Sequence, residues 1–296
     1  MTQETRKILK SSSVNGGRAS VQSTTRVVSF TSGKGGVGKT HTVINFGMAL
    51  ASLGQSVLVL DADLGLANID VMLGLHVSHT LEDVMNGTKR IDDVIIETPG
   101  GLSIIPASSG AEELCRLSSE QRLMLMSAIE EVAWKYDYLL IDTPAGIGSD
   151  VVFFNGASSE VICIISGEPT SLTDAYALIK ILARKYGEKS ISILVNNIPN
   201  QKQAERAFGR LQKAVAQFLQ IELKYLGYIP SDSAVLDAVK NQESLLLEYP
   251  SSKAARAING IARDFDANFH HKKVKGGMQF FFEQLLEVNS SERIAG

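Results

Sequence analysis

The chain has 296 residues, of which 44% are hydrophobic and 21% charged, a balance that can bury a substantial core in one large domain. Its formal net charge of -3 provides no overall basic field, so charge alone indicates no specific nucleic-acid partner. Cys115 and Cys163 form no C-x-x-C pair and lack zinc-ligand spacing, which excludes a disulfide framework and a zinc ribbon. Residues 1–25 contain no apolar signal core, and no run is long enough to span a membrane. We therefore expect a cytoplasmic protein with a flexible N-terminal arm.

Short apolar runs rich in β-branched residues alternate along the chain with longer segments of helical periodicity. In chain order, strands are expected at 26–31, 56–61, 102–107, 136–142, 160–166, 190–197 and 225–230, and helices at 40–53, 118–135, 170–187 and 201–220. This alternation predicts an α/β fold with a mostly parallel central sheet and helices on both faces. We expect one domain over residues 26–269, followed by a basic linker and a helix within 270–296.

The stretch SGKGGVGKTH, residues 32–41, connects the first predicted strand to the first predicted helix. Gly33, Gly38, Lys39 and Thr40 satisfy the pattern G-x-x-x-x-G-K-S/T in the strand-to-helix context that a phosphate-binding loop requires. Glycines let backbone N–H groups converge on a phosphate, Lys39 brings a cation to it, and the Thr40 hydroxyl can bind Mg²⁺. The sequence therefore predicts a nucleoside triphosphate site here.

Aspartates follow two other predicted strands. Asp61 and Asp63 lie at the end of the run VLVLDAD, and Asp142 ends the run YDYLLID. The carboxyl ends of parallel strands form the ligand-binding edge of an open α/β sheet, so these carboxylates are expected beside the phosphate loop. Asp142 occupies the place of a Walker B carboxylate that holds Mg²⁺ through water.

A second lysine, Lys34, gives the loop the form K-G-G-x-G-K-T, which resembles the deviant Walker A motif of the MinD/ParA class of ATPases. The resemblance implies a MinD-like P-loop NTPase fold, ATP and Mg²⁺ as ligands, and closure of two subunits on ATP. It implies that Lys34 reaches the partner subunit's phosphates, that Lys39 and Asp63 complete the catalytic set, and that Asp63 orients the attacking water. The implied metal ligands are Thr40, Asp61 and Asp142. The implied nucleotide contacts are Gly33, Gly35, Gly36, Val37, Gly38, Lys39, Thr40, His41, Asn196, Pro230 and Asp232.

The expected adenine contacts lie at the ends of two later strands, in LVNNIP and YIPSDSAVLDA. The family reads adenine with an asparagine side chain, here Asn196, and with the backbone of a turn, here Pro230, Ser231 and Asp232. Asp232 is an equally good helix cap, because Ser-Asp-Ser is a typical helix start. The guanine-reading N-K-x-D motif is absent, which favours ATP over GTP.

Within this class, residues 31–74 resemble the flagellar-number regulators FlhG, FleN and YlxH. The resemblance implies a slow Mg²⁺-dependent ATPase that hydrolyses ATP to ADP and phosphate, dimerises on ATP and controls flagellar number or placement. Implied partners are a second copy, an FlhF-type GTPase, flagellar switch proteins or a flagellar transcription activator. The chain departs from the group at His41 and in its arm, where TQETRKIL replaces D-Q-A-x-x-L-R. Alternatives are a MinD-type division ATPase, a ParA-type partitioning ATPase, and an ATP-gated transcriptional antiactivator acting as a binding module.

The predicted C-terminal helix, residues 278–288, carries five large apolar side chains at helical spacing. They are Met278, Phe281, Phe282, Leu285 and Leu286, and Lys272, Lys273 and Lys275 precede them. This segment resembles the membrane-targeting helix of MinD and FlhG, which implies reversible peripheral association with the inner face of the cell membrane. The alternative is a terminal helix packed on its own domain.

Overall fold

The computed structural model describes residues 25–64, 68–107 and 118–268, so the predicted arm, except Thr25, and the predicted helix at 278–288 lie outside the described residues. The strands are β1 (Arg26–Thr31), β2 (Val57–Asp61), β3 (Ile96–Glu97), β4 (Leu102–Ile105), β5 (Tyr138–Asp142), β6 (Glu160–Ile165), β7 (Ser190–Ile198) and β8 (Glu222–Pro230). They form one sheet in the order β3-β4-β2-β5-β1-β6-β7-β8. Every pairing is parallel except β3 with β4. The predicted α/β class is confirmed.

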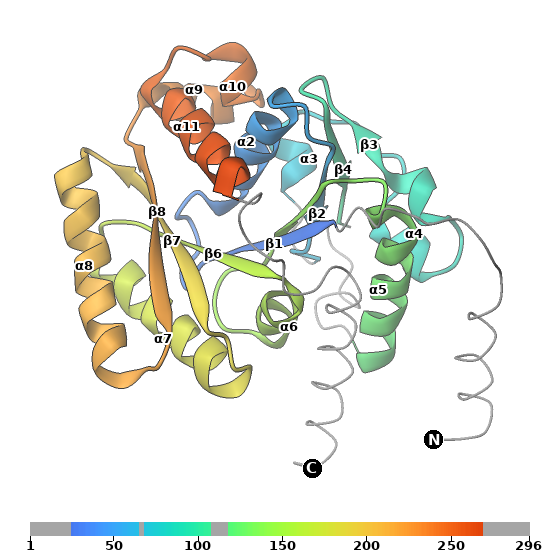
Figure 1. The fold of residues 1–296 in the computed structure, drawn as a ribbon. Coiled ribbons are helices and arrows are strands. Elements are labelled where there is room, and N and C mark those ends of the chain that lie inside the picture. Colours follow the sequence, from blue (N-terminus) through green and yellow to red (C-terminus); the bar gives the residue numbers. More distant parts are fainter. Residues whose placement is uncertain (1–24, 65–67, 108–117, 269–296) are drawn as a thin grey trace.

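Helices cover both faces of this sheet (Figure 1). They are α2 (Lys39–Ser52), α3 (Ile69–Met72), α4 (Leu81–Met85), α5 (Ser119–Ala133), α6 (Ser149–Ala157), α7 (Pro169–Lys185), α8 (Gln201–Phe218), α9 (Ser233–Asn241), α10 (Leu245–Glu248), α11 (Lys253–Ala267) and the 3₁₀ helix η1 (Ile91–Val94). One layer contains α2 and α11 with the short helices α3, α9 and α10, and the other contains α5, α6, α7 and α8. None of the described helices is long and apolar enough to cross a membrane.

The central strands are apolar on both faces because both faces are covered. Along β1, Val28 and Phe30 belong to the cluster under α2 and α11, whereas Val27 belongs to the cluster under α5 and α6. Alternate residues of a strand point to opposite faces, so such a strand reads as a continuous apolar run. Phe46 of α2 packs edge-to-face against Phe30 and Phe265, with ring centroids 5.3 and 5.4 Å away.

The sheet order brings three functional strand ends together. β5 lies between β1 and β2, and the register pairs Asp61 with Asp142 and Phe30 with Asp142. The loop after β1 therefore stands directly beside both strand-end carboxylates. Most boundaries lie within two residues of the sequence prediction; β4 ends at Ile105 before Pro106, and β8 begins three residues earlier than predicted, at Glu222.

Candidate functional site

The loop between β1 and α2 depends on glycine for space and for backbone conformation. Gly36 and Gly38 have φ values of 77° and 82°, which L side chains rarely adopt. A Cβ on Gly33 would lie 2.2 Å from the carbonyl carbon of Asp174, so the loop approaches α7 more closely than any other residue type allows. The predicted strand, loop and helix around these glycines are present, whereas the close approach to α7 was not predicted.

The loop leads into α2, and the first backbone amides of this helix have no side-chain cap. Gly38 is the residue at the N-cap, and it provides no side-chain cap for the first turn. The unsatisfied N–H groups and the helix dipole together favour an anion at this end. Lys39 and Thr40 are the next two residues, so a cation and a hydroxyl flank the same point. This arrangement suits a phosphate group.

Beneath the loop lies a buried charge cluster. The Lys39 ammonium pairs with the Asp142 carboxylate, and both side chains are almost fully buried. Asp61, also buried, faces Asp142 from the next strand. Burial and the Asp142 charge raise the pKa of Asp61 to about 7, so Asp61 is partly protonated near pH 7 and a cation bound here would favour its ionised form.

The oxygen atoms of Thr40, Asp61 and Asp142 fit Mg²⁺ better than a softer metal. Mg²⁺ prefers oxygen ligands and usually takes only one or two carboxylates, with water and substrate phosphates completing the shell. Among the described residues, no group of three or more His, Cys, Asp or Glu side chains could form a protein-only metal cage. Thr40, Asp61 and Asp142 therefore supply the kind and number of oxygen atoms that a nucleotide-bound Mg²⁺ uses.

Asp61 also shapes the segment that follows β2. Its two carboxylate oxygens accept hydrogen bonds from the backbone N–H groups of Asp63, Asn68 and Ile69, at 3.1, 3.2 and 3.4 Å. Asp63 itself is partly exposed and lines the cavity described below. The buried aspartate thus positions the segment that presents the second one.

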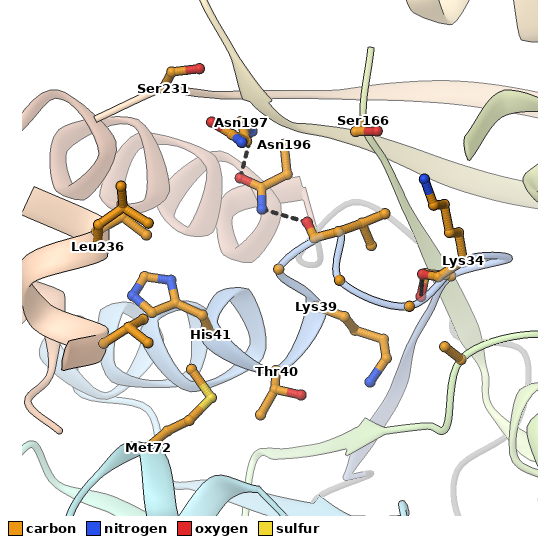
Figure 2. Close-up of a pocket in the computed structure, with 18 of the residues that line it drawn as sticks. Lys34, Lys39, Thr40, His41, Met72, Ser166, Asn196, Asn197, Ser231 and Leu236 are labelled. Carbon is orange, nitrogen blue, oxygen red and sulfur yellow. Dashed lines mark hydrogen bonds between the residues drawn. The ribbon is translucent and has the colours of Figure 1, made fainter. Parts of the chain in front are cut away.

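Lys34 leaves the loop in a different direction from Lys39, as Figure 2 shows. Its ammonium donates to the Glu168 carboxylate at 2.7 Å and to the Thr170 hydroxyl at 3.1 Å. The Lys34 side chain is 39% exposed and that of Glu168 is 63% exposed. The Lys34 ammonium is the main reason that the pKa of Glu168 is lowered. Sequence reasoning missed Glu168 and Thr170, although both follow β6 at the same edge of the sheet.

Asn196 lies at the predicted place but makes a contact that the sequence did not indicate. Its amide nitrogen donates to the Val37 carbonyl at 2.8 Å, and its amide oxygen accepts from the Asn197 N–H at 2.8 Å. Figure 2 draws both contacts. Asn197, which sequence reasoning did not single out, holds φ at 53° in this turn. Asn196 therefore fastens the phosphate loop to the end of β7.

Asp232 caps helices with both carboxylate oxygens. One oxygen accepts from the Ala234 N–H of α9 and the other from the Ala254 N–H of α11, each at 3.1 Å. Of the two roles weighed for this residue, its side chain performs the cap. The turn at 230–232 still lines the cavity, so its backbone remains available to a nucleotide base.

His41 lies on the first turn of α2, and its imidazole points into the cavity beside Leu236 and Met72 (Figure 2). Burial lowers the pKa of His41 to about 4, so the ring is neutral near pH 7. The position can therefore contribute a neutral hydrogen-bonding group but no positive charge.

Most of these residues line one cavity of about 830 Å³. Its volume lies within the range of roughly 300–1,000 Å³ that small-molecule sites occupy. The predicted residues that line it are Lys34, Gly35, Gly36, Val37, Gly38, Lys39, Thr40, His41, Asp63, Asn196, Pro230, Ser231 and Asp232. Gly33, Asp61 and Asp142 do not line it: Gly33 packs against α7, and the two buried aspartates lie below the loop. The apolar end, formed by Met72, Val235, Leu236 and Val239, was not predicted.

The chain is similar in sequence to known proteins. Residues 23–266 match the family profile described as ParA: NUBPL iron-transfer P-loop NTPase. The chain is 42% identical over 222 residues to the antiactivator FleN of Pseudomonas aeruginosa, a match that covers 75% of this chain and 79% of that protein. It is 32% identical over 226 residues to the flagellum site-determining protein YlxH of Helicobacter pylori, covering 75% of this chain and 76% of that protein.

Solved structures with a similar fold point to the same group of proteins. The cell division ATPase MinD of Pyrococcus furiosus matches with a TM-score of 0.69 and 27% identity over 82% of this chain and 98% of that one. MinD of Pyrococcus horikoshii, solved with Mg-ADP, matches with a TM-score of 0.68 and 28% identity over 82% of this chain and 96% of that one. With this profile, these relatives and the two-lysine phosphate loop at the end of β1, the chain belongs to the ParA/MinD family of P-loop NTPases.

Proposed function

We propose that the protein is an ATP-dependent dimerising switch that controls flagellar number or placement. The observation that carries the flagellar assignment is the 42% identity to FleN, which extends over 75% of the chain and is accompanied by the match to YlxH. The cavity supports the choice of ligand, because a phosphate loop lies at one end and an apolar wall at the other. ATP has both kinds of surface.

Different residues have different roles in the proposed hydrolysis. The α2 amides and Lys39 hold the phosphates, while Thr40, Asp61 and Asp142 would hold Mg²⁺, which neutralises charge on the phosphate oxygens. Asp63 orients the water that attacks the terminal phosphorus, and ADP and phosphate leave. Positioning without a strong general base predicts slow turnover, which suits a switch.

Dimerisation is proposed through Lys34. Its pair with Glu168 is exposed at both ends, and such surface pairs contribute little to stability. Exchanging the Glu168 carboxylate for a second subunit's phosphates therefore costs little.

Light scattering after gel filtration tests this proposal. The parent protein is expected to elute as a monomer with ADP and as a dimer with ATP and Mg²⁺. Lys34→Ala should bind ATP within a few-fold of the parent yet stay monomeric, and Asp63→Ala should give a dimer that persists because ATP remains intact. Lys180→Ala, which removes an exposed lysine of α7, is the matched control. A Lys34→Ala protein that dimerises and hydrolyses ATP like the parent contradicts the proposal.

One observation favours a second candidate, a ParA-type partitioning ATPase. Lys202, Arg206, Arg210 and Lys213 are exposed on α8 at intervals of three or four residues, opposite its buried face. A basic stripe of this kind suits nonspecific contact with DNA phosphates. DNA binding that weakens steeply with salt, and that Arg206→Glu with Arg210→Glu abolishes, would favour partitioning over flagellar control.

Iron transfer, which the profile description names, is not proposed. Of the two cysteines, Cys115 lies outside the described residues; Cys163 is fully buried within β6, and burial raises the pKa of its thiol to about 12. A thiol in that state is neither exposed nor ionised, so it cannot act as a transfer ligand.

The flagellar proposal implies cytoplasmic location with peripheral attachment to the membrane. It also implies partners such as an FlhF-type GTPase, switch proteins or a transcription activator.

A further inference from the structure

A hydrogen-bonded chain runs from the nucleotide cavity to α10 through two residues of α2, His41 and Asn45. The Asn45 amide nitrogen lies 2.8 Å from the His41 carbonyl oxygen and 3.3 Å from His41 Nε2. Asn45 is 1% exposed, so its amide group has no water to satisfy it. Every hydrogen bond it makes must therefore come from the protein.

The orientation of the Asn45 amide is fixed by α10. Its Oδ1 accepts from the Leu246 N–H at 3.1 Å and from the Ser244 hydroxyl at 3.3 Å. A backbone N–H can only donate, so the atom facing Leu246 must be the oxygen and the atom facing His41 must be the nitrogen. The two ends of the amide cannot be exchanged.

This orientation determines where His41 carries its proton. An amide nitrogen has two hydrogens and accepts nothing, so His41 Nε2 can meet it only as an unprotonated acceptor. A neutral imidazole with a bare Nε2 carries its hydrogen on Nδ1. Within the described residues, the hydrogen bonds of His41 to Asn45 involve Nε2 and the carbonyl oxygen, and none involves Nδ1. In the described part of the chain, Nδ1 is also not one of the buried polar atoms without a partner, so it is exposed. Because the ring lines the cavity, we take Nδ1 to be open to it.

We propose that Asn45 is a positioning residue that holds His41 as its Nδ1–H tautomer, so that a neutral donor faces an oxygen acceptor of the bound nucleotide. The inference rests on the proposed nucleotide-binding function and adds to it a residue that does not line the cavity. Lys39 supplies charge to the phosphates, whereas His41 supplies a directional hydrogen bond one residue beyond Thr40. Asn45 acts only through His41.

A double-mutant cycle on ADP affinity tests the assignment, since ADP avoids turnover. His41→Ala should weaken ADP binding by about five- to tenfold, the effect of one neutral hydrogen bond. Asn45→Leu should weaken it by a similar factor, and the double variant should be no weaker than His41→Ala. Ser244→Ala is the matched control: it removes one α10 contact of Asn45, should lower the Tm, and should leave ADP affinity within twofold.

Repeating the cycle with 2′,3′-dideoxy-ADP identifies the acceptor. A loss that persists assigns a phosphate oxygen, and a loss that disappears assigns a ribose hydroxyl. Long-range ¹H–¹⁵N spectra of the parent, with His41→Asn to assign the signal, read the tautomer even if Asn45→Leu folds poorly. Losses that multiply in the double variant, or a protonated Nε2 in the parent, overturn the inference. A parent that fails to bind ADP would instead refute the proposed function.

Discussion

Glycine at position 33 is a packing requirement, whereas glycine at position 35 is not. A Cβ on Gly33 would lie 2.2 to 2.5 Å from backbone atoms of Asp174 and Ala175, which cannot move without shifting α7. A Cβ on Gly35 would meet only the Ala145 Cβ at 4.0 Å, an ordinary contact. The two positions belong to one motif but face different environments.

Alanine substitutions at these two glycines should differ sharply in their effect on the free energy of unfolding. Gly33→Ala is expected to lower the free energy of unfolding by about 3 kcal/mol or more, because overpacking against backbone is poorly relieved. Gly35→Ala should change it by within about 0.5 kcal/mol, as exposed substitutions usually do. Urea denaturation of the nucleotide-free proteins measures both. Equal losses in the two variants would show that the α7 contact does not control the loop.

The raised pKa of Asp61 predicts how stability depends on pH. Its pKa is 3.8 in the unfolded chain and about 7 in the fold, so the native state holds more protons between those values. The contribution of Asp61 to stability is therefore complete at low pH and is lost as pH rises towards 7. Thermal unfolding of the nucleotide-free parent should show this decline relative to Asp61→Asn, which cannot titrate. Mg²⁺ with ADP should reduce the decline by neutralising the carboxylate. Parallel pH profiles for parent and variant would contradict it.

The sequence predicts the residues of the site better than it predicts their partners. Lys39 and Asp142 follow from local patterns, since each lies at a strand end or in a loop of fixed spacing. The contact of Lys34 with Glu168 joins residues 134 positions apart, and no local pattern contains that information. The same holds for Asn196 with Val37, 159 positions apart.

At the scale of elements, the long buried strands are the most predictable part. Their β-branched, uninterrupted apolar runs follow from burial on both faces. The helix α6 was not predicted, because SDVVFFNGA is apolar nearly all round and shows no helical stripe. Strand β3 has two residues, too short for a pattern. By contrast α11 was missed although it carries a clear stripe of buried residues, including Ile258 and Phe265.

The end of α11 is fixed to the sheet by a buried arginine. Arg26 pairs with Glu160, donates to the Phe265 carbonyl at 3.2 Å, and places its guanidinium 3.7 Å from the Phe265 ring centre. The neighbouring Tyr138 hydroxyl donates to Asp266 at 2.7 Å. These contacts join the first strand to the last described helix.

At this junction, the substitution that leaves a charge unpaired should lower the free energy of unfolding most. Arg26→Leu is expected to cost about 3 kcal/mol, the lower end for a broken buried pair, because the Glu160 side chain is 29% exposed. Tyr138→Phe removes two hydrogen bonds, one donated to Asp266 and one accepted from Arg26, and should cost about 2 kcal/mol. Guanidinium denaturation provides both values. A Tyr138→Phe loss as large as that of Arg26→Leu would show that the hydroxyl, and not the arginine, anchors α11.

At the scale of the whole molecule, the nucleotide site and the proposed membrane segment depend on different parts of the chain. The site is complete within residues 32–239, whereas residues 278–288 follow α11. Five large apolar side chains on one helical face could each contribute about 1.5–3 kcal/mol if fully buried. An interface buries them partly, and ordering the segment costs entropy, so one copy is expected to bind weakly. Two copies on one ATP dimer gain from effective concentration.

ATP should therefore control attachment through dimerisation. Glu283 and Glu287 lower the attraction to anionic lipid, which leaves Lys272, Lys273 and Lys275 to supply it. Co-sedimentation with anionic liposomes should increase when ADP is replaced by a non-hydrolysable ATP analogue, and a chain ending at Gly277 should not sediment in either state. Lys34→Ala, which carries the whole segment but is expected to stay monomeric, should sediment with ATP analogue only as weakly as the parent does with ADP. Sedimentation of Lys34→Ala at the parental ATP level would separate attachment from dimerisation and return residues 278–288 to the alternative of a helix packed on its own domain.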